Sequence, residues 1–184
     1  MSRQRCTIAG CGPNLYDSFE RINWDELVIV CNAAIVLVAG HETSNWIWFV
    51  EDNGVVDLAW FDHYHALYKS RLYGSAQVAE RVEVGHQYEE NPWFTWGDYA
   101  LKPGVYRGGG SVVGCGMQWA DEHGYDSTLC GVDMAGSQSI SHINRPVYAA
   151  GHWNFKKACI NALIAGPMPN TRTISRTELV CKPL

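Results

Sequence analysis

A glycine-rich segment in the second half of the chain combines residue types that bind phosphate. Arg107 precedes three glycines, and Ser111 follows them at the expected start of a helix. The first backbone N–H groups of a helix have no partner within it, and the helix dipole favours an anion at this end. A serine there can also cap the helix. The segment therefore predicts a phosphate site that includes Arg107, Gly109, Gly110 and Ser111. The alternative is a flexible crossover entry into the helix without a ligand.

A second glycine-rich turn stands near the amino terminus. Gly10, Cys11, Gly12 and Pro13 follow a short apolar segment. The turn lacks the third glycine and the spacing of the dinucleotide fingerprint, and the chain has no G-x-x-x-x-G-K-[ST] loop, so neither a nicotinamide or flavin site nor the common ATPase loop is indicated. Two interpretations remain open. The turn is either a tight strand-to-helix connection or a contact for phosphate or ribose.

Three carboxylates stand where strands are expected to end. Asp133 closes the strand that follows the Ser111 helix, and Glu51 and Asp52 close another. A carboxylate in this place can accept a hydrogen bond from a sugar hydroxyl or hold Mg²⁺ beside phosphate oxygens. Asp133 is the better candidate because it follows the glycine-rich segment. The alternative for all three is solvation or capping of a neighbouring helix.

His152 is the candidate for proton transfer. It follows Gly151 at the start of an expected helix, directly after a polar segment over residues 135–150 that is a candidate lid. Imidazole titrates near neutral pH and can take a proton from an attacking hydroxyl. A capping or merely exposed histidine is the alternative. His63 and His65 do not predict zinc, because residues two apart point to different sides of a helix.

The apolar pattern of the chain predicts the elements that position these residues. Residues 27–31 and 46–50 are apolar on both faces, as buried parallel strands require. Asn32 stands where the first of these strands ends. We expect strands at 6–10, 27–31, 46–50, 81–84 and 127–132 with an edge strand at 172–180, and helices from 14 or 17 to 21 and at 62–72, 111–123 and 152–165.

This alternation predicts an α/β fold with one mostly parallel sheet, helices on both faces and ligands beyond the carboxyl ends of the strands. The length of 184 residues, without internal repeat or linker, indicates a single domain over residues 1–184. The net charge is −5 and no run of Lys or Arg exceeds two residues, which disfavours nucleic acid as a partner. A small anionic ligand remains compatible with this charge.

The cysteines and apolar runs bear on the compartment. There are seven cysteines, an odd number, and none of them forms a C-x-x-C pair, which favours reduced, mostly buried thiols in the cytoplasm. The longest apolar run, residues 27–40, is interrupted by Asn32 and is shorter than the ~20 residues of a membrane helix. We therefore expect no transmembrane segment, and the amino terminus has no evident signal peptide.

Four elements together resemble a known superfamily. They are Gly-Cys-Gly-Pro-Asn at 10–14, Val-Cys-Asn-Ala-Ala at 30–34, the stretch from Gly-Gly-Ser-Val to Gly-Val-Asp over 109–133, and Gly-His at 151–152. In this order they resemble a Rossmann-like transferase superfamily. It includes bacterial CMP-sialic-acid-dependent sialyltransferases of surface glycans, motility-associated flagellin glycosyltransferases and archaeal 6-hydroxymethylpterin diphosphokinases.

The resemblance implies roles for particular residues. In the sialyltransferases, residues in the matching positions contact CMP, and the histidine after the lid deprotonates the acceptor hydroxyl. Carried over, the nucleotide contacts become Cys11, Asn32, Arg107 and Ser111, and the general base becomes His152.

Two departures weaken the sialyltransferase assignment. Cys11 replaces an asparagine of the opening loop, and Ala135 follows Met134 where sialyltransferases have tyrosines that grip the leaving phosphate. The uninterrupted Gly-Gly-Ser-Val start of the helix is more similar to the flagellin-glycosyltransferase and pterin-diphosphokinase branch. The departures weaken CMP-sialic acid as the donor and leave the sugar of the nucleotide-sugar open, within a sialyltransferase-like glycosyltransferase.

The sequence as a whole predicts His-assisted glycosyl transfer from a nucleotide-sugar to a hydroxyl of a glycan or another acceptor, with no tightly bound cofactor or metal. Two alternatives stay open. One is diphosphate transfer from ATP of the 6-hydroxymethylpterin type, in which Asp133 with Glu51 or Asp52 would hold Mg²⁺. The other is a nucleotide-binding module without catalysis. A homo-oligomer is compatible with either activity.

Overall fold

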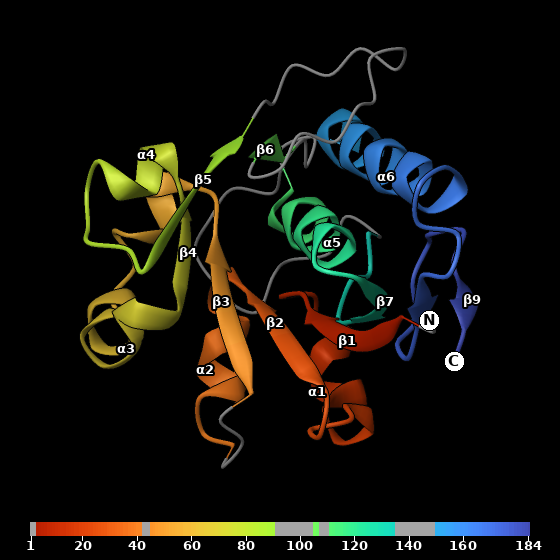
Figure 1. The fold of residues 1–184 in the computed structure, drawn as a ribbon, viewed down its shortest axis with the longest axis horizontal. Coiled ribbons are helices and arrows are strands. Elements are labelled where there is room, and N and C mark those ends of the chain that lie inside the picture. Colours follow the sequence, from red (N-terminus) through yellow and green to blue (C-terminus); the bar gives the residue numbers. More distant parts are fainter. Residues whose placement is uncertain (1–2, 42–44, 91–104, 107–110, 135–149) are drawn as a thin grey trace.

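A computed structural model of the protein describes residues 3–41, 45–90, 105–106, 111–134 and 150–184. Within these residues the strands form one sheet in the order β6-β5-β4-β3-β2-β1-β7-β8-β9, and every neighbouring pair is parallel (Figure 1). The strands are β1 (Gln4–Ala9), β2 (Leu27–Cys31), β3 (Trp46–Val50), β4 (Leu72–Ser75), β5 (His86–Glu90), β6 (Val105–Tyr106), β7 (Tyr125–Cys130), β8 (Arg172–Thr173) and β9 (Lys182–Pro183).

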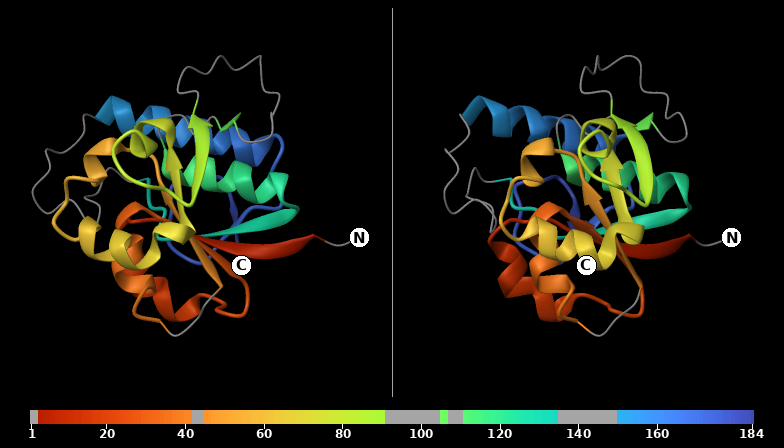
Figure 2. Two further views of the ribbon diagram at one scale, coloured as in Figure 1. Left: turned by 60° about the vertical axis from the view of Figure 1, so that its left-hand side comes forward. Right: turned by 90° about the vertical axis from the view of Figure 1, so that its left-hand side faces the viewer.

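Helices cover both faces of this sheet (Figure 2). Buried side chains of α5 and α6 belong to one hydrophobic cluster, and those of α1 to α4 belong to a second cluster on the opposite face. The expected α/β fold with a parallel sheet is confirmed. The α-helices are α1 (Asn14–Ser18), α2 (Ile35–Val38), α3 (Phe61–Tyr68), α4 (Ala76–Ala79), α5 (Val112–Glu122) and α6 (Ala150–Ala165), and 3₁₀ turns lie at Phe19–Arg21, Asn32–Ala34, Asn53–Val55 and Lys69–Arg71.

The apolar strands at the centre explain why the sheet is buried on both sides. In β2, Val28 and Val30 pack into the cluster beneath α1 and α2, whereas Ile29 and Cys31 pack into the cluster beneath α5. All four side chains are fully buried. Successive side chains of a strand point to opposite faces, so only a run that is apolar throughout satisfies both layers.

Helix α5 crosses the sheet at close range. A Cβ atom on Gly116 would lie 3.1 Å from Cγ2 of Ile29 and 3.8 Å from Cγ2 of Ile8. Glycine inside a helix lowers its stability by about 1 kcal/mol relative to alanine. The gain here is that α5 packs directly on β1 and β2.

The sheet order places a topological switch at β1. The chain proceeds from β1 through β6 in one direction and then returns to place β7 on the other side of β1 (Figure 1). After β1 the chain continues into α1, and after β7 it leads to α6 on the opposite face. In open parallel sheets, ligands bind beyond the carboxyl ends of the strands at such a switch point.

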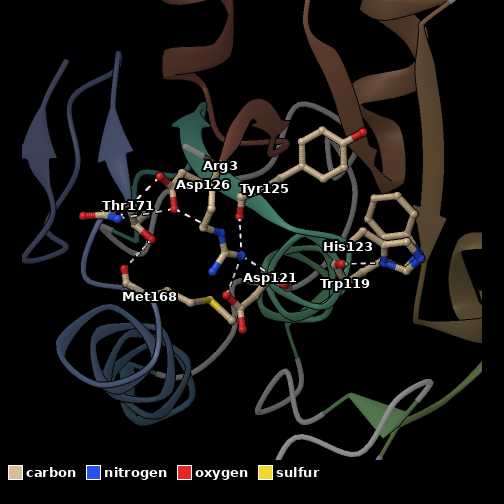
Figure 3. Close-up of polar contacts among 9 residues, drawn as sticks. Arg3, Trp119, Asp121, His123, Tyr125, Asp126, Met168 and Thr171 are labelled. Atoms are coloured by element: carbon tan, nitrogen blue, oxygen red, sulfur yellow. Dashed lines mark hydrogen bonds and ion pairs between the residues drawn. The ribbon is translucent and has the colours of Figure 1, made fainter. Parts of the chain in front are cut away.

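An arginine cluster ties the same two strands together at their amino ends (Figure 3). Arg3 Nη2 lies 2.7 Å from Oδ1 of Asp121 and donates to the backbone oxygen of Tyr125 at 2.9 Å. Its Nε lies 3.5 Å from Oδ1 of Asp126. A small cavity of about 30 Å³ adjoins these side chains and Met168. Ion pairs of Arg3 thus stabilise the amino ends of β1 and β7, at the edge of the sheet opposite the one where ligands are expected.

Several expected elements differ from the structure. Residues 81–84 are not a strand: they form the turn after α4, and the strands on either side are β4 and β5. The sequence signal failed because Gly74 interrupts β4 and because β5 is mostly polar and exposed, as a strand near the sheet edge can be. The helix expected over 62–72 ends at Tyr68, and Leu72 already belongs to β4.

The expected edge strand over 172–180 is largely absent as well. It is reduced to Arg172–Thr173. The residues that follow leave the sheet register and run along the end of β7. There the backbone N–H of Ile174 donates to the backbone oxygen of Leu129 at 3.0 Å.

Candidate functional site

The loops that follow β1 and β7 meet at the switch point. Gly10 N donates to the oxygen of Cys130 and Gly12 N donates to the oxygen of Gly131, each at 2.8 Å. These two amides are therefore engaged by the protein itself. The glycine-rich turn over residues 10–13, which we call the opening loop, thus continues the pairing of β1 with β7 beyond the ends of the strands.

Asp133 joins the two loops through its side chain. Its Oδ2 accepts a hydrogen bond from the backbone N of Asn14, the first residue of α1, at 3.3 Å. The residue is only 7% exposed. A carboxylate of the protein thus stands at the start of α1, where the helix dipole favours a negative charge. A phosphate beside this loop would meet that charge.

The glycines of the opening loop serve this close contact. A Cβ atom on Gly12 would lie 2.5 Å from Oδ2 of Asp133, and one on Gly10 would lie 2.6 Å from the oxygen of Gly131. Both distances are well inside van der Waals contact. Packing between the two loops therefore requires glycine at these positions, whatever else the loop binds. Pro13 is exposed and precedes α1.

Two buried oxygens beside β1 have no hydrogen-bond partner among the described residues. They are Oδ1 of Asn32, which follows β2, and Oδ1 of Asp133, which follows β7. Leaving a buried acceptor unsatisfied costs about 1–3 kcal/mol. Because β2 and β7 flank β1, the two acceptors stand on either side of the opening loop at the carboxyl edge of the sheet.

Two residues at this edge, Asn32 and the neighbour of Asp133, have a left-handed backbone conformation. Asn32 has φ 46° and Met134 has φ 54°, and few residues other than glycine adopt the left-handed region. The backbone oxygen of Asn32 accepts a hydrogen bond from Nε1 of Trp48 at 2.9 Å. Residues in such conformations cluster at ligand-binding and catalytic sites.

Cys11, in the loop after β1, contacts the last residue of β2. It is half-buried, and its thiol donates to the backbone oxygen of Cys31 at 3.3 Å. Cys31 is fully buried, and burial raises the pKa of its thiol well above the usual value. Burial likewise raises the pKa of Cys130 to about 12. Cys115 is fully buried in the cluster beneath α5, as expected for a packing residue.

Ser111 directly precedes α5 at the N-cap position, but its hydroxyl does not cap the helix. The residue has the extended backbone of a cap, φ −132° and ψ 113°, and it makes no side-chain cap hydrogen bond. Its backbone oxygen accepts from Cys115 N at 3.2 Å. The expectation of a serine cap is therefore wrong, and the first-turn N–H groups receive nothing from this side chain. Because α5 leads into the amino end of β7, it begins at the carboxyl edge of the sheet.

The remaining candidates are only partly covered by the structure. Arg107, Gly109 and Gly110 lie outside the described residues, as do residues 135–149 of the candidate lid. Ala150, the last residue of that segment, is the first residue of α6, and His152 lies in the first turn of this helix. The expected helix after the lid is thus confirmed, two residues earlier than predicted.

The other two acidic residues make local contacts, Asp52 through its side chain and Glu51 through its backbone oxygen. Asp52 accepts from Gly54 N at 2.7 Å and caps a 3₁₀ turn. Ser75 donates to the backbone oxygen of Glu51 at 2.7 Å. In the part of the chain that the structure describes, no three His, Cys, Asp or Glu side chains come together as metal ligands. Among the same residues, no helix is both long and apolar enough to cross a bilayer.

Sequence reasoning missed one group of residues at this edge. Ser175, Thr177 and Glu178 contact the loop from Gly131 to Asp133, with Thr177 Oγ1 donating to the oxygen of Val132 at 2.6 Å. The hydroxyl residues clustered from Thr171 to Thr177 were the available signal. Ser175, Thr177 and Glu178 fall within the expected edge strand over 172–180, so the pattern did not indicate a contact with the β7 loop.

Comparison with known proteins supports the fold. The sequence matches no protein-family model and no curated protein. The structure resembles that of the MAf glycosyltransferase from Magnetospirillum magneticum AMB-1, with a TM-score of 0.68 and 18% sequence identity over the whole of this chain. The match covers 34% of that protein, so this chain spans about a third of its length. At this identity the likeness establishes a shared Rossmann-like fold.

The contact between the two loops predicts the effect of adding one methyl group. Gly12→Ala should lower the free energy of unfolding by about 1–3 kcal/mol, because the new Cβ overlaps the Asp133 carboxylate. Gly40→Ala is the matched control, since the nearest atom to a Cβ there is the Leu37 oxygen at 3.7 Å. Denaturant unfolding measures both variants. Equal stability of the two would contradict the close contact.

The environment of Asp133 predicts a pH-dependent stability. Burial raises the pKa of its carboxyl above the ordinary 3.8, an effect that hydrogen bonds from Asn14 partly offset. A carboxyl with a raised folded pKa binds protons more readily in the folded chain, so its contribution to stability falls as pH rises from the unfolded pKa through the folded one. The difference in unfolding free energy between wild type and Asp133→Asn should therefore decline from acid toward neutral pH and then level off. A difference independent of pH would show that this carboxyl keeps its ordinary pKa.

Proposed function

We propose that this chain is a glycosyltransferase-like domain that binds a nucleotide-sugar at the carboxyl edge of its sheet, beyond β1, β2 and β7. The observation that carries the proposal is the pair of unpartnered buried acceptors, Asn32 Oδ1 and Asp133 Oδ1, on either side of the opening loop. Their position coincides with the switch point, where open parallel sheets bind ligands.

The chemistry of these acceptors indicates which part of the ligand they bind. Carboxylate and amide oxygens accept hydrogen bonds, so they need a ligand with donors, and hydroxyl groups of ribose or of a sugar are such donors. A phosphate has only acceptors at neutral pH and would be repelled by Asp133. We therefore assign the hydroxyl-bearing part of the nucleotide-sugar to Asn32 and Asp133.

The phosphates then belong at the start of α5. Its first-turn N–H groups receive no cap from Ser111, and the helix dipole favours an anion there. Arg107, Gly109 and Gly110, which precede Ser111 in the sequence, would complete the phosphate contacts. In this arrangement Gly10, Cys11, Gly12 and Pro13 shape the floor of the site, since the amides of Gly10 and Gly12 already bind the β7 loop.

His152 is the proposed general base. His152 belongs to the first turn of α6. Because the amino end of a helix disfavours a positive charge, we expect a neutral imidazole there, as a general base requires. The acceptor hydroxyl gives its proton to His152 while its oxygen attacks the anomeric carbon. The bond from that carbon to the phosphate oxygen breaks, and the nucleotide leaves. Positioning and stabilisation of the leaving phosphate supply the rest of the acceleration. The likeness to the MAf glycosyltransferase supports this class of reaction.

Nucleotide binding is the first test. A panel of CMP, CDP, UDP, GDP and ATP, each with and without Mg²⁺, should raise the melting temperature for at least one member, because ligand at 100 times its Kd stabilises by ~2.7 kcal/mol. No response to any of them would end the proposal. A response confined to ATP with Mg²⁺, and abolished by chelation, would instead indicate diphosphate transfer.

The proposed role of Asn32 predicts discrimination between ribose and deoxyribose. Wild type should bind the ribonucleotide about tenfold more tightly than its deoxy analogues, the value of one hydrogen bond to a buried acceptor. Asn32→Gly keeps the left-handed backbone and removes the amide, so it should abolish the preference. Asn154→Gly, at an exposed position of α6, is the control. An undiminished preference in Asn32→Gly would remove this residue from the ligand contacts.

Loss of the base predicts loss of turnover without loss of binding. His152→Ala should keep nucleotide affinity and lower the rate of glycosyl transfer by about 10²–10⁴. His63→Ala, which changes an exposed histidine of α3, should leave both unchanged. Unaltered turnover in His152→Ala would exclude it as the base. Nucleotide binding by wild type with no transfer to any acceptor would indicate a module without catalysis.

A further inference from the structure

The segment over residues 174–179, which we name the C-terminal strap, runs along the loop that carries Asp133. Three successive loop residues are bound: Gly131 N donates to Oγ of Ser175 at 3.0 Å, Thr177 Oγ1 donates to the oxygen of Val132 at 2.6 Å, and Glu178 N donates to the oxygen of Asp133 at 3.1 Å. The β1 loop binds the same backbone through Gly12 N. The β7 loop is thus bound by protein segments from two directions.

The strap is itself well ordered by local contacts. Thr173 Oγ1 donates to the oxygen of Ser175 at 2.9 Å, and Thr177 Oγ1 accepts from Leu179 N at 3.2 Å. Ile174 is buried in one hydrophobic cluster and Leu179 in the other. A segment anchored at both ends in this way can hold the β7 loop at a defined place.

The strap also contacts the helices on both faces of the sheet. Asn14 Nδ2, from α1, donates to the oxygen of Arg176 at 3.0 Å. Lys157 Nζ, from α6, lies 2.6 Å from Oε2 of Glu178, and the side chains are 28% and 52% exposed. Asp133 and the helix that carries His152 are therefore connected through adjoining residues of one segment.

We propose that the C-terminal strap positions Asp133 and sets its placement relative to the first turn of α6, with Thr177 and the Lys157–Glu178 ion pair as positioning residues of the site. This inference rests on the proposed function for its catalytic consequence. An exposed ion pair contributes little to stability. A displacement of about 1 Å at a catalytic site can nevertheless lower a rate about 10²-fold. Positioning should therefore affect turnover far more than folding.

Thr177→Val tests the hydrogen bond to the β7 loop. Thr171→Val is the matched control, because Thr171 also donates its buried hydroxyl to a backbone oxygen, that of Met168 at 2.8 Å, near the amino end of β7 (Figure 3). Thr177→Val should weaken nucleotide binding about tenfold. It should also shift the titration of the Asp133 carboxyl, followed by carbon NMR, toward the ordinary range as water reaches it. Thr177→Ser, which keeps the hydroxyl, should restore both properties, and Thr171→Val should change neither.

The NMR titration separates the two proposals, because it needs no ligand. If wild type binds no nucleotide, the proposed function fails, whereas a shifted Asp133 titration in Thr177→Val still supports the positioning role. An Asp133 titration that is the same in wild type, Thr177→Val and Thr171→Val overturns the role of the strap. Failure of Thr177→Ser to restore the titration overturns it too.

The ion pair is tested by exchange of its charges. Glu178→Gln and Lys157→Met should each lower kcat about tenfold with nucleotide affinity unchanged, and the double variant Lys157→Glu with Glu178→Lys should recover most of the rate. A purely structural role would affect thermal stability and not kcat. Full kcat in both single variants, or no recovery in the exchanged pair, would overturn the coupling to α6.

Discussion

The close approach of the loops after β1 and β7 is the constraint on which the candidate site depends. Gly12 N reaches the oxygen of Gly131, and the space that a side chain on Gly12 would need is taken by the Asp133 carboxylate. From this contact follow the need for two glycines, the carboxylate at the start of α1 and the burial of Asp133. The remaining oxygen of Asp133 is left without a partner among the described residues.

Because of this constraint, the two glycine-rich segments, residues 10–13 and 107–111, have different roles in the proposed site although they are similar in sequence. The amides of Gly10 and Gly12 serve the contact between the loops, so in the proposed site the first segment contributes shape rather than anion binding. The second segment leads into a long helix whose first turn is not capped by Ser111. In the proposed site, electrostatics would therefore separate a hydroxyl-binding side from a phosphate-binding side within one edge of the sheet.

Much of the fold could be predicted because the central strands are buried on both faces. Residues 27–31 and 46–50 are strands over those residues, and Asp133 and Asn32 stand at the carboxyl edge as expected. The prediction of strands failed near one edge of the sheet, at β4 and β5, where the strands are short and β5 is mostly polar. The pattern predicts a strand over residues 81–84, which form a turn, and does not predict β5 (His86–Glu90), which is mostly exposed.

The finer geometry of the site was not predictable, because it arises between residues distant in sequence. Asp133 meets Asn14 across 119 positions, and Thr177 meets Val132 across 45. Local pattern carries no information on such pairs. The failed cap at Ser111 has the same origin: propensity favours a capping hydroxyl there, but the tertiary surroundings decide its orientation.

The central place of β1 also has a consequence for how the protein is made. Arg3, which directly precedes β1, binds backbone oxygens 118 and 122 residues further along the chain, at the end of α5 and the start of β7. At 5–20 residues per second, a ribosome delivers those partners on the order of ten seconds after β1 has been synthesised. Throughout that interval the edge of β1 that will pair with β7 is unpaired, and an unpaired strand edge is the kind of surface on which other chains pair. Pairing of both edges of β1, and the end of their exposure to misassembly, therefore waits for the synthesis of β7.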